Sequence, residues 1–204
     1  MTPAAVVRAL RPALSGRGWV EAPGGFAREL SPDLRARLEI GVRRETGGAA
    51  RQRAVQVTLG VWVGPIEREL RAVFGEDPRA DACESTVSAS LDALAGRARP
   101  RRIGGRADLD DVARGIARNV VQHGEAWLAE TTRLEAMTSA LERATPGSAS
   151  ARRRLIVAAW LDGSLEARVE AMRPALARLP GFEREALRAL LDHLHARAPA
   201  ARIP

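Results

Sequence analysis

Two long stretches of alternating apolar and polar residues limit most strongly what this chain can fold into. The apolar residues occupy even positions in 34–44 and odd positions in 53–63. They are Leu34, Ala36, Leu38, Ile40 and Val42, then Val55, Val57, Leu59, Val61 and Val63. Alternation with a period of two over this length indicates β-strands that are buried on one side. We therefore expect a sheet with one aliphatic face and one polar face.

The parity of the apolar positions also restricts how these two strands pair. If they are antiparallel neighbours, facing residues must have numbers with an odd sum, because a slip by one residue would turn one aliphatic face to water. Pairing Val42 with Val55 satisfies this rule. The same register sets Arg35 opposite Trp62 on the polar face.

The rest of the N-terminal part predicts helices and a few shorter strands. Thr2-Pro3 is a typical helix start, and Pro12 predicts a kink or an early end of that helix before Gly16. Short strands are expected over 26–30 and 101–104, a helix over 66–74, and a helix from Asp108 to His123-Gly124 with its buried stripe in 109–120. Residues 87–94 fit a strand and a helix equally well.

The C-terminal part predicts helices alone. Thr132 and Glu135 have the spacing of a capping box, and 144–150 has the composition of a linker. Three helices follow, over 152–161, 165–179 and 182–195, and Ser164 is placed to cap the second.

The expected fold class is α+β. It is an antiparallel meander of three to five strands packed on helices, with a helical C-terminal extension. The first helix and the 109–120 helix would cover the aliphatic face. The expected division is an α+β domain over 1–143, a linker over 144–150 and the extension over 151–204.

The composition indicates where in the cell the protein is expected more than it indicates an activity. The 204 residues contain one cysteine, Cys83, which excludes an internal disulfide. The chain has no apolar signal-peptide core and no apolar run of membrane-spanning length, so we expect a cytoplasmic protein without membrane association. All 32 basic residues are arginine, and the composition is typical of a GC-rich bacterial coding sequence. The net charge of +7 is therefore weak evidence for a nucleic-acid partner.

The order of these features resembles the bacterial domain of unknown function 4304 family. The resemblance covers residues 4–142. The features that carry it are Gly18-Trp19, Phe26 and Arg28, the two long strands, Gly64-Pro65, Cys83, Leu91 and Leu94, the 108–112 helix start and Trp127-Leu128. The resemblance implies a fold and no established activity.

No motif predicts a catalytic, cofactor or metal site. His193 and His195 are two residues apart on an expected helix and point to different faces, which does not suit a shared metal. His123 with Glu125 could act as a general base with an acidic orienter, but no nucleophile accompanies it. Cys83 lies between acidic residues, which raise a thiol pKa. The Gly47-Gly48 and Gly104-Gly105 pairs lack the spacing of a phosphate loop.

Two surfaces remain as candidates for binding. The arginine-rich stretch 97–106 could meet phosphates, although it contains no aromatic residue for base stacking. The polar sheet face combines arginine with tryptophan, the residue types most frequent at binding hot spots. Its predicted binding residues are Arg35, Arg37, Arg43, Gln56, Thr58 and Trp62. The competing interpretation is that the C-terminal helices cover this face and Trp62 belongs to the core.

The leading functional hypothesis is a non-catalytic binding protein whose partner is another protein, of the kind of the immunity proteins found beside bacterial toxins. The first alternative is an arginine-rich nucleic-acid-binding protein. The second alternative is a hydrolase that uses His123.

Overall fold

The two alternating segments form the longest strands of an antiparallel sheet. The computed structural model describes residues 2–44, 53–75, 85–104 and 106–197. Strand β3 spans Leu34–Arg44 and strand β4 spans Arg53–Val63, as the alternation predicts. The apolar positions from Leu34 to Ile40 and from Val55 to Val63 are buried, so the assignment of the two faces is confirmed. The expected 45–50 loop lies outside the described residues.

Shorter strands extend the sheet on both sides of this pair. The order is β1-β2-β3-β4-β5, and β6 also pairs with β4. The bounds are β1 (Val20–Ala22), β2 (Gly25–Ser31), β5 (Val87–Ser90) and β6 (Arg101–Ile103). The three-residue β1, which forms an antiparallel hairpin with β2, was not expected from the sequence. The fold class is α+β, as predicted.

Two contacts across β3 and β4 agree with the register that parity predicts. The Arg35 guanidinium lies over the Trp62 ring. A Cβ atom placed on Gly41 would lie 3.7 Å from the backbone oxygen of Gln56. The numbers of both pairs have the odd sum that the Val42–Val55 register requires.

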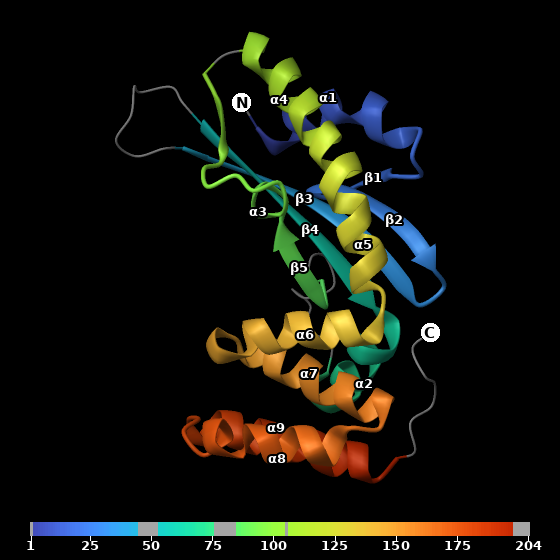
Figure 1. Cartoon of the computed structure of the whole chain (residues 1–204), viewed down its shortest axis with the longest axis vertical. Coiled ribbons are helices and arrows are strands. Elements are labelled where there is room, and N and C mark those ends of the chain that lie inside the picture. Colours follow the sequence, from blue (N-terminus) through green and yellow to red (C-terminus); the bar gives the residue numbers. More distant parts are fainter. Residues whose placement is uncertain (1, 45–52, 76–84, 105, 198–204) are drawn as a thin grey trace. The chain divides into compact units, whose positions relative to one another are not determined.

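Helices cover the aliphatic face. Helix α1 (Pro3–Ser15) contacts β3 and packs against α4 (Arg106–Asn119), and α4 contacts β6 (Figure 1). Both helices bury their apolar sides, including Leu10 and Ile116, which have no exposed surface. Pro12 lies inside α1, which continues to Ser15.

The expected end at His123-Gly124 of the helix that begins near Asp108 is wrong. The chain continues through a π-helical turn, η1 (Val120–Gly124), directly into α5 (Glu125–Thr131). Gly124 is buried, and a Cβ atom there would lie 3.1 Å from the Leu59 side chain. Because glycine has no side chain, η1 can lie close to β4 at Gly124, and the helical path continues instead of ending there.

The ambiguous 87–94 stretch contains both elements that its pattern allowed. Strand β5 is followed directly by α3 (Leu91–Leu94). The Ser90 side chain accepts a hydrogen bond from the Ala93 backbone N–H and caps this short helix.

The chain divides into two compact units that are each discontinuous in sequence. Unit 1 comprises 1–62 and 88–130, and unit 2 comprises 63–87 and 131–204. The 144–150 segment does not separate them: it forms η2 (Thr145–Gly147) and the start of α7 within unit 2. The other helices of unit 2 are α2 (Gly64–Phe74), α6 (Leu134–Ala144), α7 (Ala149–Asp162), α8 (Leu165–Leu176) and α9 (Gly181–His195).

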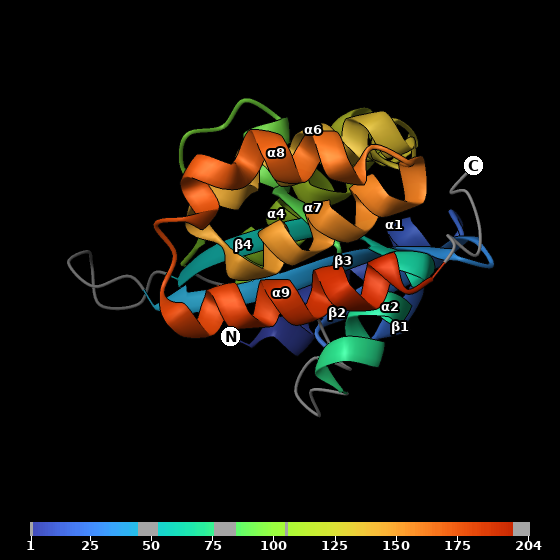
Figure 2. The same cartoon turned by 90° about the horizontal axis from the view of Figure 1, so that it is seen from below.

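Helix α7 is the centre of unit 2. It contacts α2, α6, α8 and α9, and in the view of Figure 2 it lies between α8 and α9. Its residues from Leu155 to Leu161 are all buried, as expected for a helix surrounded by others. Ser148 caps its start by accepting a hydrogen bond from the Ala151 N–H.

Buried arginines at the start of α7 are compensated by acidic residues from other helices. Arg154 Nε donates to Glu67 Oε1 of α2 over 2.8 Å, and the Thr86 hydroxyl lies 2.7 Å from the same oxygen. Arg152 donates to Glu183 of α9 over 2.6 Å. Cations at a helix start oppose the helix dipole, and these partners offset that cost.

Two expected helix caps differ from the structure. The N-cap position of α6 is Arg133, one residue beyond the predicted Thr132. Ser164 occupies the N-cap position of α8 as predicted, but its side chain makes no capping hydrogen bond. Within the described residues, no helix has the length and apolar character needed to span a membrane.

Candidate binding surface on the sheet

The structure brings all six predicted binding residues to one face of the sheet in unit 1. Arg35, Arg43 and Gln56 are exposed, and Arg37, Thr58 and Trp62 are half-buried. They occupy the positions that alternate with the buried aliphatic residues of β3 and β4. The pleat of the two strands thus positions every one of them.

Arg35 and Trp62 form the most defined pair on this face. The guanidinium carbon of Arg35 lies 5.7 Å from the centre of the indole ring. This is within the ~6 Å reach of a cation–π interaction, which contributes about 0.5–1 kcal/mol at an exposed site. The contact places a guanidinium group and an indole ring side by side on the polar face.

A carboxylate lies among the arginines of the same face. Arg37 Nε is 3.6 Å from Glu39 Oε1, and Arg37 also donates to the backbone oxygen of Pro23 over 3.2 Å. Partial burial raises the pKa of Glu39 above its ordinary value, and the nearby charge of Arg37 lowers it by a smaller amount. Glu39 Oε1 is buried without a hydrogen-bond donor within the described ranges.

One end of the face opens into a hollow of about 410 Å³. Arg43 and Gln56 line it from the sheet, and Arg97 and Arg99 line it from the segment that follows α3. Sequence reasoning treated the polar face and the arginine-rich stretch as separate candidates. Pairing of β6 with the start of β4 brings them together, and the only sequence signal for this pairing is the short strand expected over 101–104.

The candidate general base does not have the carboxylate that would orient it. His123 is half-buried in η1. Glu125 instead accepts two hydrogen bonds from Arg28, of 2.9 and 2.6 Å. Arg28 also lies over the Trp19 ring at 4.9 Å. These contacts give Glu125 a structural role in joining α5 to β2.

The two C-terminal histidines lie on different sides of α9, as their spacing predicts. His193 is 2.9 Å from Glu69 of α2, and His195 is 3.0 Å from Glu166 of α8. No group of three or more His, Cys, Asp or Glu residues with metal-binding geometry occurs in the part of the chain that the structure describes. Cys83 lies outside that part.

No protein-family model, curated protein or solved structure matches this chain. The resemblance to the domain of unknown function 4304 family therefore stays a prediction.

Proposed function

We propose that this chain is a non-catalytic protein-binding module of the bacterial cytoplasm and that it binds through the polar face of its sheet. The observation that carries the proposal is the Arg35–Trp62 contact on a face where Arg43 and Gln56 are exposed. Tryptophan and arginine are the most common anchors of protein interfaces, and an anchor held in place loses little conformational entropy on binding.

The partner surface that suits this face is acidic. Arg35, Arg37 and Arg43 outnumber the acidic residues Glu29 and Glu39 on the same face. Carboxylates of a partner could form charge-assisted hydrogen bonds with the exposed Arg35 and Arg43. An apolar partner side chain would pack on the indole. The immunity-like form of the hypothesis, in which the partner is a toxin, rests on the size of the chain and on the lack of a catalytic motif.

The test compares the full-length protein with an Arg35→Ala/Trp62→Ala variant as bait in a lysate of the source organism. The partner is a protein that the wild type retains and the variant loses, identified by mass spectrometry. The matched control is Arg8→Ala, since Arg8 is an exposed arginine of α1 away from this face.

Affinity measurements with the purified partner then test whether the polar face is the binding surface. We expect Trp62→Ala and Arg35→Ala each to weaken binding by at least about 1 kcal/mol, and Arg8→Ala to leave it unchanged. Thermal unfolding should show that both variants stay folded. If the wild type and the double variant retain the same proteins, or if the partner binds both equally, the polar face is not the binding surface.

A further inference from the structure

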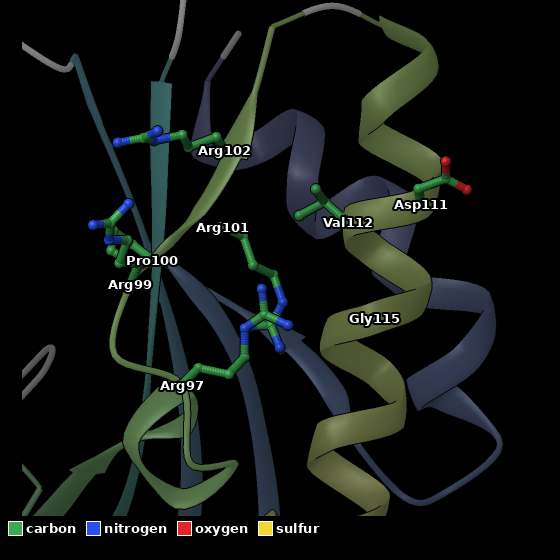
Figure 3. Close-up of a pocket in the computed structure, with 8 residues that line it drawn as sticks. All are labelled: Arg97, Arg99, Pro100, Arg101, Arg102, Asp111, Val112 and Gly115. Carbon is green, nitrogen blue, oxygen red and sulfur yellow. The ribbon is translucent and has the colours of Figure 1, made fainter. Parts of the chain in front are cut away.

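A second hollow in unit 1 has an unusual concentration of positive charge. It lies between β6 and α4 and encloses about 440 Å³ (Figure 3). Arg97, Arg99, Arg101 and Arg102 line it together with Gly115 of α4. In Figure 3 the guanidinium groups of Arg97 and Arg101 point toward α4, and those of Arg99 and Arg102 point away from it. No aromatic residue is among the residues that line it.

Two of these arginines converge on one counter-ion. Arg101 is only 6% exposed, and its Nη1 atom donates to Asp92 Oδ1 over 2.5 Å. Arg97 Nε lies 3.8 Å from the same oxygen. Figure 3 shows the two guanidinium groups meeting in the cleft, whereas the Asp111 carboxylate points away from it. One carboxylate thus faces two guanidinium cations.

This arrangement leaves positive charge inside the cleft at neutral pH. Burial lowers the pKa of Arg101, Asp92 raises it and the charge of Arg97 lowers it further. Because an arginine pKa starts above about 12, Arg101 still remains a cation. Beyond Asp92, the structure shows no hydrogen-bond acceptor for Arg101 within the described ranges. Its remaining N–H groups are free to bind an anion.

The helix on the other side of the cleft lies close to Arg101 at a glycine. A Cβ atom placed on Gly115 would lie 3.7 Å from Arg101 Nε. Glycine inside a helix costs about 1 kcal/mol relative to alanine, so its presence in α4 has no local conformational benefit. A side chain longer than alanine at this position would extend into the cleft.

We propose that this cleft binds the phosphate group of a small phosphomonoester, with Arg97 and Arg101 as its ligands. Arg97, Arg101 and Asp92 together keep one net positive charge, which attracts the phosphate anion, and its oxygens accept the paired N–H donors that arginine presents. The volume is in the ~300–1,000 Å³ range of small-molecule sites. The lack of aromatic lining argues against recognition of a nucleic-acid strand through stacked bases.

The test is calorimetric titration of the full-length protein with inorganic phosphate and with glycerol phosphate, at constant ionic strength. We expect one saturable site for both ligands. Arg97→Gln should weaken binding at least tenfold, and the matched control Arg188→Gln, at an exposed position on α9, should not change it. Affinity should rise between pH 5 and pH 7.5, because the second phosphate pKa is near about 6.

A steric variant tests the cleft without removing an arginine, since a side chain at position 115 would press against Arg101 Nε and extend into the cleft. Gly115→Leu keeps every arginine and should abolish binding, while circular dichroism shows that α4 still forms. Three results would each overturn the proposal: equal losses for Arg97→Gln and Arg188→Gln, full binding by folded Gly115→Leu, or salt-sensitive binding of a single-stranded oligonucleotide that phosphate does not displace. The Arg35→Ala/Trp62→Ala variant should bind phosphate normally, so this proposal and the proposed function fail separately.

Discussion

Replacing Val57 by aspartate tests the assignment of the sheet faces on which the candidate site depends. Val57 lies in the middle of β4 with no exposed surface, between the equally buried Val55 and Leu59. The substitution removes the burial of an aliphatic side chain, which contributes about 1.5–3 kcal/mol. It also places a carboxylate among aliphatic groups, which costs several kcal/mol even when the group takes up a proton.

The lost burial and the buried carboxyl group together cost an amount comparable to the ~5–15 kcal/mol by which a typical domain is stable. We therefore expect Val57→Asp to be unfolded or aggregated at 25 °C, as shown by circular dichroism and size-exclusion chromatography. Gln56→Asp is the matched control, because the neighbouring Gln56 is exposed on the polar face. Its free energy of unfolding, measured in urea, should lie within about 0.5 kcal/mol of the wild type, as for most surface substitutions. If the two variants unfold at the same urea concentration, the assignment of the faces is wrong.

Three further perturbations test other parts of the structure. Since burial raises the Glu39 pKa above its ordinary 4.5, this group stabilises the fold most at low pH, and that stability is lost as the pH rises through the raised value. Glu39→Gln should therefore gain stability relative to the wild type between pH 4 and pH 7 in urea titrations, and a constant difference would refute this. Gly124→Val should cost about 1–3 kcal/mol through overpacking against Leu59, and thermal unfolding should show a smaller cost in a Leu59→Ala background. A chain that ends at residue 143 lacks the α7 partner of Glu67, so trypsin should cut within α2, and protection of α2 would show that it folds without the C-terminal helices.

The sheet was predictable because its signal is local and repeated. Five alternating apolar positions in each of β3 and β4 leave one orientation that turns them all inward, with Val42 half-buried near the end of β3, and parity then restricts the register. The same argument predicts that Arg35 lies opposite Trp62, and the Arg35 guanidinium lies over the Trp62 ring in the structure. Strand β1 carries no such signal, since three residues are too few for a period and Val20 is exposed.

The predictions from sequence differ from the structure at positions where a distant contact decides the local structure. Gly124 has the sequence signature of a helix end, but Leu59 approaches it from the sheet and the helix continues. The 144–150 segment has the composition of a linker, but Ser148 caps α7 within a single unit. The residues around Gly124 do not show that Leu59 approaches it from the sheet. The residues in 144–150 do not show how α7 packs.

The candidate site was predictable only in part, for the same reason. Alternation identified the six residues of the polar face. It could not show that β6 pairs with β4 or that Arg97 and Arg101 converge on Asp92. A run of arginines in a sequence does not reveal which of its side chains face one another.

The ion pair between Glu67 and Arg154 has a consequence for how the protein is made. Its members are 87 residues apart, and synthesis proceeds from the N-terminus. At ~5–20 residues per second, the α2 segment acquires Glu67 about 4–17 s before the chain acquires Arg154. During that interval its two inward-facing acids, Glu67 and Glu69, have neither Arg154 nor His193 as partners. We expect these hydrated carboxylates to oppose premature association of the segment with other nascent segments, so the groups that later hold unit 2 together also keep this segment solvated until its partners are made.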